Sequence, residues 1–575
     1  MRDLDDLTAA PEELFLNPWR DFHVQALQQA VPPWEVMEGG LIEGFPVSDH
    51  VAMNDRMRGT IRRLMAHKRF SSPILARSVP VLMEDVTCHR SFVSSGGKFL
   101  LSGAAGSRLL NRFRWENVDL GAPDVLLNLY FQQMQWQNEG MSLPNHLGVL
   151  EPDTPFVIPC RNTFNYFHFL TESLSQLTLL DGLHHTGDIY FTFPNAPEKQ
   201  GPFARAYVDA LFPEYADRVQ FVRAPLHLDK AITPFDLMCG HLHMPPSMQR
   251  GIAALLPGDH QDNATLHTIS ALPMLSSNAV PQPLLALRER ALKAIAAKDF
   301  GRLPRRFFVG RDSRQSRERS MGGADVLFDH LEMFDFEYLV FENLAPLEQI
   351  AAMAQAEMMV SYHGAGFANM LFAGKGAHVI EIGTHQTAQH RWRDFWPLAN
   401  AAQCKYTCFF ADYAQEDPLA EPRFKDDGLV PAVLSEEAIG QVMAFVVTIL
   451  GNVPSLTKTE TLTTLARQLL AVKAYPQLLD LLAAHGDLVR KDGTLCLLQA
   501  DCHKELDETR SELVALDLAY KADPSRWQTL VRMIWCANRC ERPQVIRWAL
   551  SRLETDFPER HSAFVGNHEW VRYVA

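Results

Sequence analysis

Two histidines stand in sequence surroundings that suit chemistry on a phosphate or a hydroxyl group. The first, His363, lies in SYHGAGFANMLF, after a short apolar run and before two glycines. The run EMMVSY predicts a strand and GFANMLFA a helix, so residues 363–366 form a strand-to-helix turn. Free N–H groups at the start of such a helix, together with its dipole, favour phosphate. The alternative is a tight turn in which the glycines serve only the backbone.

Arginines crowd into FFVGRDSRQSRER, directly after a second predicted strand at 306–310. They are Arg311, Arg314, Arg317 and Arg319. Arg binds phosphate oxygens in fixed, often bidentate geometry. Because ligands of doubly wound sheets bind at the carboxyl ends of the strands, we expect this segment and the HGAG turn to share one edge. A pyrophosphate, as in a sugar nucleotide, satisfies both, whereas the alternative is a solvated loop with internal salt bridges.

The second histidine lies in the earlier half of the chain, in NYFHFLTESLSQL (165–177). On a helix, Asn165, His168 and Glu172 share one face, and apolar residues occupy a largely opposite face. A His and a carboxylate four residues apart provide a general base for a hydroxyl nucleophile. Either His168 or Glu172 fits that role. The alternative is an ordinary amphipathic helix with its polar side in water.

The remaining histidines give no metal-binding pattern. His184 and His185, like His241 and His243, have no third partner at ligand spacing. We find no DxD motif in a position to hold a nucleotide-bound divalent cation. We therefore expect neither a metal nor another cofactor.

Composition excludes several classes of protein. The 575 residues are 47% hydrophobic and 21% charged, which is typical of a soluble protein with several domains. A formal net charge of −14 argues against nucleic acid as the main partner. The acidic start is not a signal peptide, and no apolar run is long enough to span a bilayer. Nine Cys, an odd number in a long chain, favour a reducing, cytoplasmic location.

The elements that position these residues alternate between strand and helix. In the first block, strands are predicted at 155–160, 188–193 and 219–224. In the second block, they are predicted at 305–310, 336–342, 357–362 and 377–383. Helices separate them, and this pattern predicts two Rossmann-like lobes with parallel sheets.

The chain is thereby divided into four predicted parts. They are an N-terminal extension (1–75), a first lobe (76–300), a second lobe (301–450) and a helical region (455–575). Within the first lobe, 245–283 is rich in Pro, Ser and Asn and is predicted to be loop or linker. Paired amphipathic helices in the last part suggest a helical repeat or bundle. A tetratricopeptide-like arrangement is one interpretation, although no strict 34-residue register is evident.

Together, the three polar segments resemble glycosyltransferase family 61, over roughly residues 155–415. Members of that family carry an N-x-x-H-x-x-x-[DE] segment, an arginine-rich strand end and a GxHGAGxxN-type motif. The matching residues are Asn165, His168, Glu172, Arg314, Arg317, Tyr362, His363, Gly364, Ala365, Gly366 and Asn369. The sequence departs from the pattern at Gly310, where the family has Ser, and at 321–325, where an Asn-Glu pair is missing.

The resemblance implies a GT-B fold, with the acceptor on the first lobe and the nucleotide sugar on the second. It implies inverting, metal-independent transfer of a hexose or pentose, with a UDP-sugar as the expected donor. His168 or Glu172 would be the base. The donor-binding residues would be Asn165, Arg311, Arg314, Arg317, His363, Gly364, Ala365, Gly366, Asn369 and Glu381. In particular, Asn369 would fix the turn or touch the nucleotide, and Glu381 would reach ribose or uracil.

The expected acceptor is a hydroxyl of a glycan, a lipid-linked saccharide or a protein, in bacterial polysaccharide or capsule synthesis. Two alternatives remain at this point. One is a non-catalytic glycan- or nucleotide-binding scaffold, whose helices at 455–575 recruit a protein partner. The other is a GT-B enzyme that uses a CMP-activated sugar.

Overall fold

The computed structural model describes most of the chain and divides it into two compact units. The described residues are 10–29, 32–67, 72–89, 91–116, 123–141, 146–161, 165–193, 203–255, 268–311, 321–417, 419–451 and 458–574. The first unit comprises Met1–Phe45, Asp55–Glu318 and Leu339–Phe410, and the second comprises Pro46–Asn54, Arg319–Tyr338 and Ala411–Ala575. Among the described helices, none combines the length and the apolar character needed to cross a membrane.

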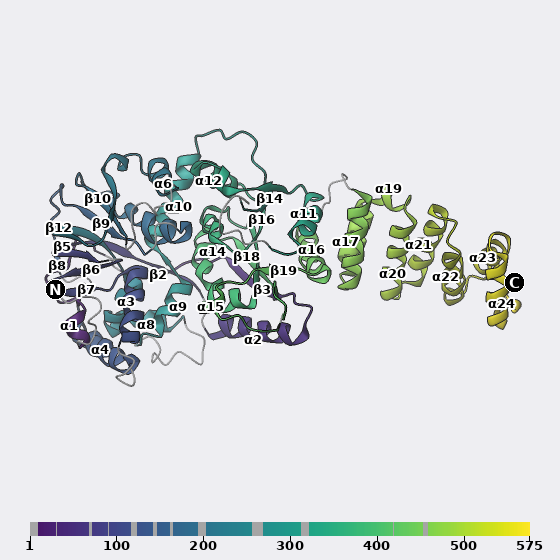
Figure 1. The fold of residues 1–575 in the computed structure, drawn as a ribbon, viewed down its shortest axis with the longest axis horizontal. Helices are drawn as coiled ribbons and strands as arrows, with labels where there is room; N and C mark the ends of the chain where they lie inside the picture. Colours follow the sequence, from purple (N-terminus) through teal and green to yellow (C-terminus); the bar gives the residue numbers. More distant parts are fainter. Residues whose placement is uncertain are drawn as a thin grey trace. The chain divides into compact units, whose positions relative to one another are not determined.

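The first unit contains a nine-stranded sheet. Its strands are β1 (Gln25–Ala26), β5 (Ser78–His89), β6 (Phe92–Ser95), β7 (Lys98–Leu100), β8 (His146–Leu147), β9 (Phe156–Pro159), β10 (Ile189–Phe193), β11 (Val219–Arg223) and β12 (Leu226–Asp236). Their order is β11-β10-β9-β12-β5-β1-β8, with β6 and β7 branching from β5 (Figure 1).

This sheet is mixed, whereas the sequence pattern predicts a parallel one. The strands β9, β10 and β11 are parallel as predicted. In contrast, β5 pairs antiparallel with β12, from Cys88 opposite Leu226 to Ser78 opposite Asp236. The strands β5, β6 and β7 are joined by short turns that permit only antiparallel pairing. Between β6 and β7, Gly96 and Gly97 have φ of 56° and 76°, which suits a two-residue hairpin.

The N-terminal residues are part of the sheets and do not form a separate extension over 1–75. The strand β1 pairs with β5 and with β8. The strand β3 (Leu41–Pro46) pairs with β18 (Lys405–Tyr413). A three-stranded sheet joins β2 (Trp34–Val36), β4 (Ile74–Ala76) and β13 (Ala279–Pro281). These pairings connect segments far apart in sequence, so no local sequence pattern predicts them.

The predicted loop at 245–283 is wrong for its described residues. It contains α8 (Pro246–Ala253), α9 (Ala271–Asn278) and β13. Both helices are short, and Pro lies within the first two positions of α8. Pro is tolerated there because the first N–H groups of a helix have no partner within the helix. The polar composition of this segment therefore led to a loop prediction, although the segment contains two short helices that are partly buried.

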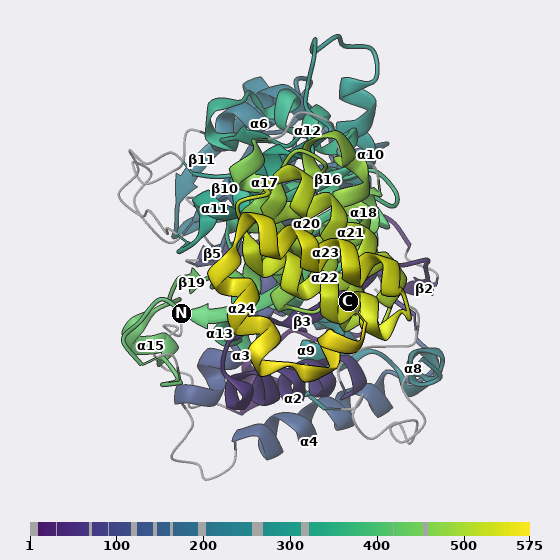
Figure 2. The ribbon, with the colours of Figure 1, turned by 90° about the vertical axis from the view of Figure 1, so that its right-hand side faces the viewer.

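A second sheet in the first unit agrees with the predicted strands. Its central strands are β14 (Arg306–Val309), β16 (Met358–Tyr362) and β17 (His378–Thr384), which are parallel to one another. The strand predicted at 336–342 is shorter, since β15 covers Glu337–Leu339 and a 3-10 turn follows. The helices α6 (Phe203–Leu211), α10 (Gln282–Ile295) and α12 (Pro346–Ala354) contact one another (Figures 1 and 2).

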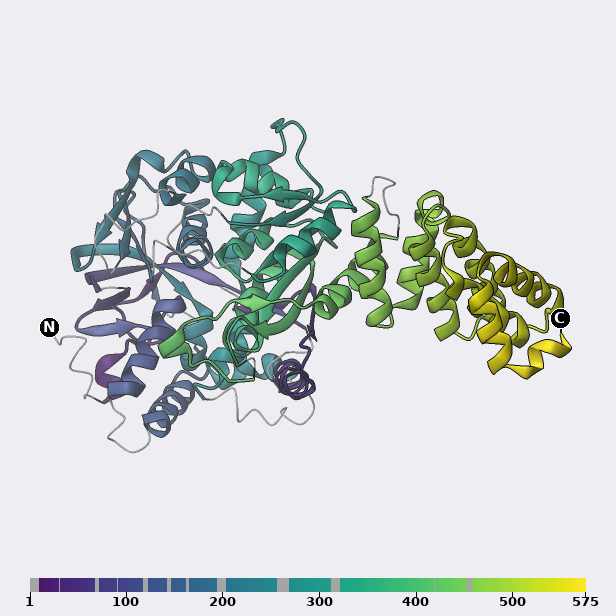
Figure 3. The same ribbon diagram turned by 45° about the vertical axis from the view of Figure 1, so that its right-hand side comes forward.

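In the second unit, the described residues from Lys458 onward are helical and regularly spaced. Three helices, α17 (Thr459–Ala471), α20 (Gly493–Glu505) and α22 (Trp527–Arg539), begin 34 residues apart. The helices that follow them show the same spacing, in α18 (Tyr475–Ala484), α21 (Thr509–Ala522) and α23 (Pro543–Asp556). Lys473, Asp507 and Glu541 adopt positive φ in the turns between the partners. Figure 3 shows these helices following one another in green to yellow.

Candidate functional site

The arginine segment and the HGAG turn begin at the same edge of the second sheet. Because β14 and β16 are parallel neighbours, Arg311 and His363 both follow carboxyl ends. The Nη2 atom of Arg311 donates to the His363 carbonyl at 3.4 Å, and its guanidinium lies 5.6 Å from the centre of the Tyr362 ring. A Cβ atom at Gly364 would lie 2.0 Å from Arg311 Nη2. The glycine therefore makes room for the guanidinium.

The other predicted arginines cannot be placed. Arg314, Arg317 and Arg319 lie outside the described residues. Whether they face the same ligand as Arg311 thus stays a prediction.

The HGAG turn is extended and then enters a 3-10 helix, Ala365–Phe372. Gly364 has φ of 178° and ψ of 173°, a region open to any residue, so left-handed backbone is not the reason for this glycine. The helix starts two residues earlier than the expected Phe367. Its first N–H groups, from Ala365 and Gly366, lack intrahelical acceptors, as at any helix start. These N–H groups could receive an anion, and binding of a phosphate at this turn stays a prediction.

The ring of His363 contacts the buried carboxylate of Glu381. Its Nδ1 atom contacts Glu381 Oε1, and the Tyr406 hydroxyl donates to Glu381 Oε2. The Glu381 side chain is 0% exposed. The expected contact of Glu381 with ribose or uracil does not agree with this position, because the side chain is buried and both of its oxygens have partners. Glu381 lies within β17, where both faces of the strand are covered, and it orients the His363 ring.

The polar residues of the first sheet follow β9. Asn165 caps the short helix α5 (Tyr166–His168), accepting from the His168 N–H at 3.3 Å. The next turn, Phe169–Ser173, is a π-helix in place of a regular α-helix. Such turns recur at functional sites. Despite this difference, His168 and Glu172 remain on one side, as predicted.

Arg161, His168 and Glu172 form a compact cluster. His168 Nδ1 lies 2.8 Å from Glu172 Oε1. Arg161 Nη2 lies 2.5 Å from the same oxygen and 2.7 Å from His168 Nδ1. Since a guanidinium only donates, Glu172 is the acceptor within reach for a proton on Nδ1.

Glu172 is poised as an anion. Burial would raise the pKa of its carboxyl, but the hydrogen bond from His168 and the charges of His168 and Arg161 outweigh burial and lower that pKa. Its Oε2 atom is buried and has no hydrogen-bond partner among the described residues. A carboxylate whose pKa is lowered is a weaker base, which favours the orientation of a His over the removal of a proton.

Aromatic contacts bring the two histidine clusters together. The ring of Phe395 lies 5.6 Å from that of His363 and 5.5 Å from that of Phe167. Phe167 in turn lies 5.3 Å from His168, measured between ring centroids. All of these residues belong to the first unit. The edge of the second sheet therefore meets the segment that follows β9.

Asp394 lies between these clusters. Its side chain is 43% exposed, and its Oδ2 atom lies 3.5 Å from Arg391 Nη1. Surrounding protein nevertheless raises the pKa of the Asp394 carboxyl, and that rise is opposed by nearby cations. These opposing groups are Arg391, Arg161, His363 and His168. Asp394 therefore has an opening to solvent and lies within electrostatic reach of both clusters.

Asn369 does not face such an opening. It is 0% exposed, and its Oδ1 atom accepts from the Tyr166 hydroxyl at 2.6 Å. Of the two roles expected for Asn369, fixing the turn agrees with this position, whereas contact with a nucleotide does not.

Sequence reasoning missed Arg161, Asp394 and Tyr406. A signal existed for the first, because Arg161 lies two residues after the apolar strand β9, as Arg311 lies two residues after β14. Asp394 lies in HRWRDF, a charged run after β17 and α13 (His385–His390). Tyr406 had no local signal, since it is one aromatic residue in the apolar strand β18.

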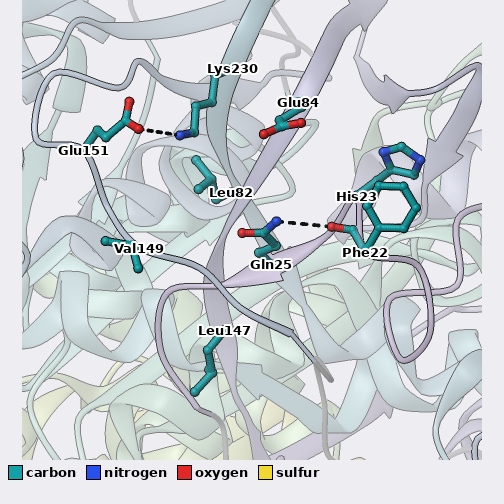
Figure 4. A pocket seen from close by; sticks show the side chains of 9 residues that line it. All are labelled: Phe22, His23, Gln25, Leu82, Glu84, Leu147, Val149, Glu151 and Lys230. Carbon is teal, nitrogen blue, oxygen red and sulfur yellow. Dashed lines mark hydrogen bonds and ion pairs between the residues drawn. The ribbon is translucent and has the colours of Figure 1, made fainter.

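A cavity of about 260 Å³ lies elsewhere in the first unit (Figure 4). It is lined by Phe22, His23, Gln25, Leu82, Glu84, Leu147, Val149, Glu151 and Lys230. Lys230 Nζ donates to Glu151 Oε1 at 2.9 Å. Lys230 precedes Ile232, which pairs with the first residue of β9, whereas the candidate site follows the carboxyl end of β9. The cavity is therefore separate from the candidate site.

The parts of the chain that the structure describes contain no group of three or more His, Cys, Asp or Glu arranged to hold a metal ion. The absence of a cofactor stays an expectation.

Comparison with known proteins gives one result. A family model described as Glycosyltransferase 61 matches residues 166–380, from the first residue of α5 to the third residue of β17. No curated protein matches the chain. The matched stretch contains His168, Glu172, Arg311, His363 and Asn369.

Proposed function

We propose that this chain is a glycosyltransferase, because the family model described as Glycosyltransferase 61 matches residues 166–380, as the resemblance predicted. On this premise, we propose that it transfers a hexose or pentose with inversion, from a nucleoside-diphosphate donor to a hydroxyl, in the cytoplasm and without a required metal. The expected donor is a UDP-sugar. The acceptor is a glycan, a lipid-linked saccharide or a protein in bacterial polysaccharide synthesis.

One observation carries the proposal: a His–carboxylate pair and an anion-binding turn meet at Phe395. Its ring contacts His363 of the turn and Phe167, the neighbour of His168. Inverting transfer needs these two functions on opposite sides of one anomeric carbon. A base activates the hydroxyl, and positive groups receive the leaving diphosphate.

His168 is the proposed base, and Glu172 orients it. With the proton of Nδ1 directed to Glu172 Oε1, 2.8 Å away, Nε2 keeps a lone pair for the acceptor hydroxyl. The pKa of Glu172 is lowered, against the effect of its own burial, by the hydrogen bond and charge of His168 and by Arg161. Glu172 therefore stays anionic and stabilises the imidazolium that forms.

The chemical step is a single displacement. The acceptor O–H bond breaks and its proton moves to His168 Nε2, while the oxygen forms a bond to the anomeric carbon. At the same time, the bond from that carbon to the diphosphate oxygen breaks, and the electron pair stays on the diphosphate. Arg311, His363 and the N–H groups of Ala365 and Gly366 stabilise this developing charge.

Arg391 and Asp394 extend the proposed site. Asp394 is an exposed carboxylate that interacts electrostatically with both histidine clusters. It can accept a hydrogen bond from a hydroxyl of either sugar, and Arg391 limits its repulsion of the diphosphate. We assign it to substrate orientation.

The helices from Thr459 onward are proposed to bind a protein partner. Their 34-residue spacing equals that of tetratricopeptide repeats, which are helix-turn-helix units that stack into extended surfaces. This interpretation accounts for a helical segment that the sugar-transfer chemistry does not use.

The first experiment is a binding panel with UDP, GDP, CMP and their sugar conjugates, by calorimetry, with and without EDTA. It compares the wild type with the Arg311→Ala, His363→Ala double variant. A matched control, Arg20→Ala with His146→Ala, removes the same two residue types at β8 and its surroundings, where His146 Nε2 contacts the Arg20 carbonyl.

Binding of one nucleoside diphosphate that resists EDTA and is lost only in the site variant supports the proposal. Preference for CMP would favour a transferase that uses a CMP-activated sugar. Binding to glycan without transfer, and without effect of His168→Ala, would favour the scaffold. Equal nucleotide binding by wild type and site variant would contradict the assigned donor site.

A further inference from the structure

Four polar side chains, three of them buried and one partly buried, form a closed ring of contacts between helices that flank the nine-stranded sheet and the second sheet. The Tyr166 hydroxyl donates to Asn369 Oδ1 at 2.6 Å, and Asn369 Nδ2 donates to Gln349 Oε1 at 3.2 Å. The Tyr207 hydroxyl lies 3.0 Å from the same Gln349 oxygen and 2.7 Å from the Tyr166 hydroxyl. Each member thus contacts two others.

Three members of the ring are buried, and Tyr166 is partly buried. Tyr207 is 1% exposed, Asn369 0% and Gln349 9%. Burial raises the pKa of Tyr166 and of Tyr207, so both hydroxyls keep their protons and remain donors. Each hydroxyl has one proton, which Tyr166 donates to Asn369 and Tyr207 donates to Gln349, so the contact between the two hydroxyl oxygens has no proton of its own. Buried polar groups are costly unless they are hydrogen-bonded, so the hydrogen bonds that run from Tyr207 through Gln349 and Asn369 to Tyr166 fix these side chains in one arrangement.

The four members come from four different elements. Tyr166 begins α5, two residues before His168, and Tyr207 lies on α6. Gln349 lies on α12, and Asn369 lies on the 3-10 helix that begins in the HGAG turn. Gln349 also donates to the carbonyls of Phe341 and Leu344, at 2.8 and 3.0 Å, which ties the ring to the end of the β15 segment.

We propose that Tyr207 and Gln349 are positioning residues for sugar transfer, because they complete the ring that holds the His168 turn in register with the HGAG turn. Neither residue touches the reacting groups. They act through Tyr166 on the base side and through Asn369 on the diphosphate side. The role in catalysis rests on the proposed function, whereas the coupling between the two turns does not.

The physical argument is one of geometry. A base and a diphosphate site on separate sheets work only when their spacing suits a displacement at one carbon, and a misplacement of about 1 Å can cost about 100-fold in rate. The aromatic rings around Phe395 limit how closely the two turns approach each other, but ring packing sets their relative orientation only weakly. Hydrogen bonds are directional, so the ring sets the register that packing leaves open.

The first arm of the test measures hydrogen exchange and needs no substrate. It compares wild type with Tyr207→Phe and Gln349→Leu, following peptides over 165–180 and 365–372. We expect both peptides to lose protection together in each variant. Tyr190→Phe is the matched control, because its hydroxyl donates at 3.0 Å to nearby Asp188 on the surface and takes no part in the ring.

The second arm measures transfer with the UDP-sugar that binds most tightly in the panel. For Tyr207→Phe, we expect kcat to fall about 10-fold with the donor KM unchanged within about twofold, since a displaced base affects the transition state more than donor binding. The Tyr166→Phe, Tyr207→Phe double variant is expected to lose no more than the poorer single variant, because residues of one network are not additive.

Each outcome decides a different point. If exchange rises only within α6, or in neither peptide, the proposed coupling is wrong. If exchange rises in both peptides but kcat equals that of Tyr190→Phe, or if the double variant shows additive losses, the ring is structural and not a positioning device. If wild type transfers sugar from no donor, the proposed function fails, and the exchange arm still decides whether the ring couples the turns.

Discussion

The first unit contains two His–Glu pairs that look alike in contact and differ in surroundings. In both pairs, His Nδ1 faces Glu Oε1, in His168–Glu172 and in His363–Glu381. Glu172 is 20% exposed and shares its oxygen with Arg161, whereas Glu381 is 0% exposed and receives the Tyr406 hydroxyl. The Glu172 carboxylate is thus partly open to solvent, whereas the Glu381 carboxylate is sealed.

In the proposed function, this difference separates a reacting pair from a holding pair. A His that must gain and lose a proton needs an anion beside one ring nitrogen and substrate beside the other, and these are the places proposed for Glu172 and for the acceptor at His168. A His that only contacts a diphosphate needs a fixed ring direction, which the buried Glu381 and Tyr406 provide. The same two residue types thus serve different ends because their third partners differ.

The largest effect is expected when the His168–Glu172 pair is broken. His168→Ala should lower kcat by about 10²–10⁴-fold, the usual cost of losing a general base, while UDP binding persists. Steady-state transfer assays and calorimetry measure the two quantities. His146→Ala serves as the control, and a loss below about 10-fold would remove His168 from the role of base.

Removal of the buried Glu381 carboxylate should lower the free energy of unfolding. Glu381→Ala leaves His363 and the Tyr406 hydroxyl without their buried partner, so we expect a loss of about 3–5 kcal/mol in the free energy of unfolding. Urea denaturation measures it, with Glu289→Ala on the exposed face of α10 as the control. A loss equal to that of the control would show that the pair is not the anchor of His363.

A smaller change sharpens the same comparison. Tyr406→Phe keeps the ring but removes the donor to Glu381 Oε2, for an expected loss of about 1–3 kcal/mol in the free energy of unfolding. The control is Tyr190→Phe, whose lost bond to Asp188 lies at the surface. If both variants unfold alike, the Tyr406 bond adds nothing to the sealing of Glu381.

The smallest expected effect is a dependence of the free energy of unfolding on pH. The pKa of Glu172 is lowered from an unfolded value near 4.5, because the His168 hydrogen bond and the His168 and Arg161 charges outweigh burial. A lowered pKa contributes stability that is complete above pH 4.5 and is lost as the pH falls through the folded value. Unfolding of wild type and Glu172→Gln, measured from pH 7 downward, should therefore converge only below pH 4.5. A constant difference would contradict the assigned charge state.

Much of the second sheet could be predicted because its pattern is local. Apolar runs of four to seven residues, separated by amphipathic helices, lead directly to the parallel strands β14, β16 and β17. The first sheet could not be predicted in the same way. Pairing of β5 with β12 joins segments separated by most of the first lobe, and only their complementary surfaces in space select it.

The residues of the candidate site also fall into two groups, those that a local sequence pattern predicts and those that it does not. The spacing of His168 and Glu172, and of the residues in the HGAG turn, was visible because each set lies within one turn of chain. Asp394, Arg161 and the ring of Tyr166, Tyr207, Gln349 and Asn369 were not visible as a site, since each partner comes from a different element. Arg314 and Arg317, outside the described residues, remain predictions from sequence alone.

By itself, the sequence determined which side chains stand at the strand ends and which chemistry they can perform. Residue type and short spacing are enough for that, because a strand end and a helix start present the same groups in any fold. Only the tertiary structure decided that Glu381 points inward as a support, that Asn369 is sealed against Tyr166, and that Phe395 unites the two histidine clusters. These outcomes depend on burial and on direction across long separations in sequence, which no local pattern encodes.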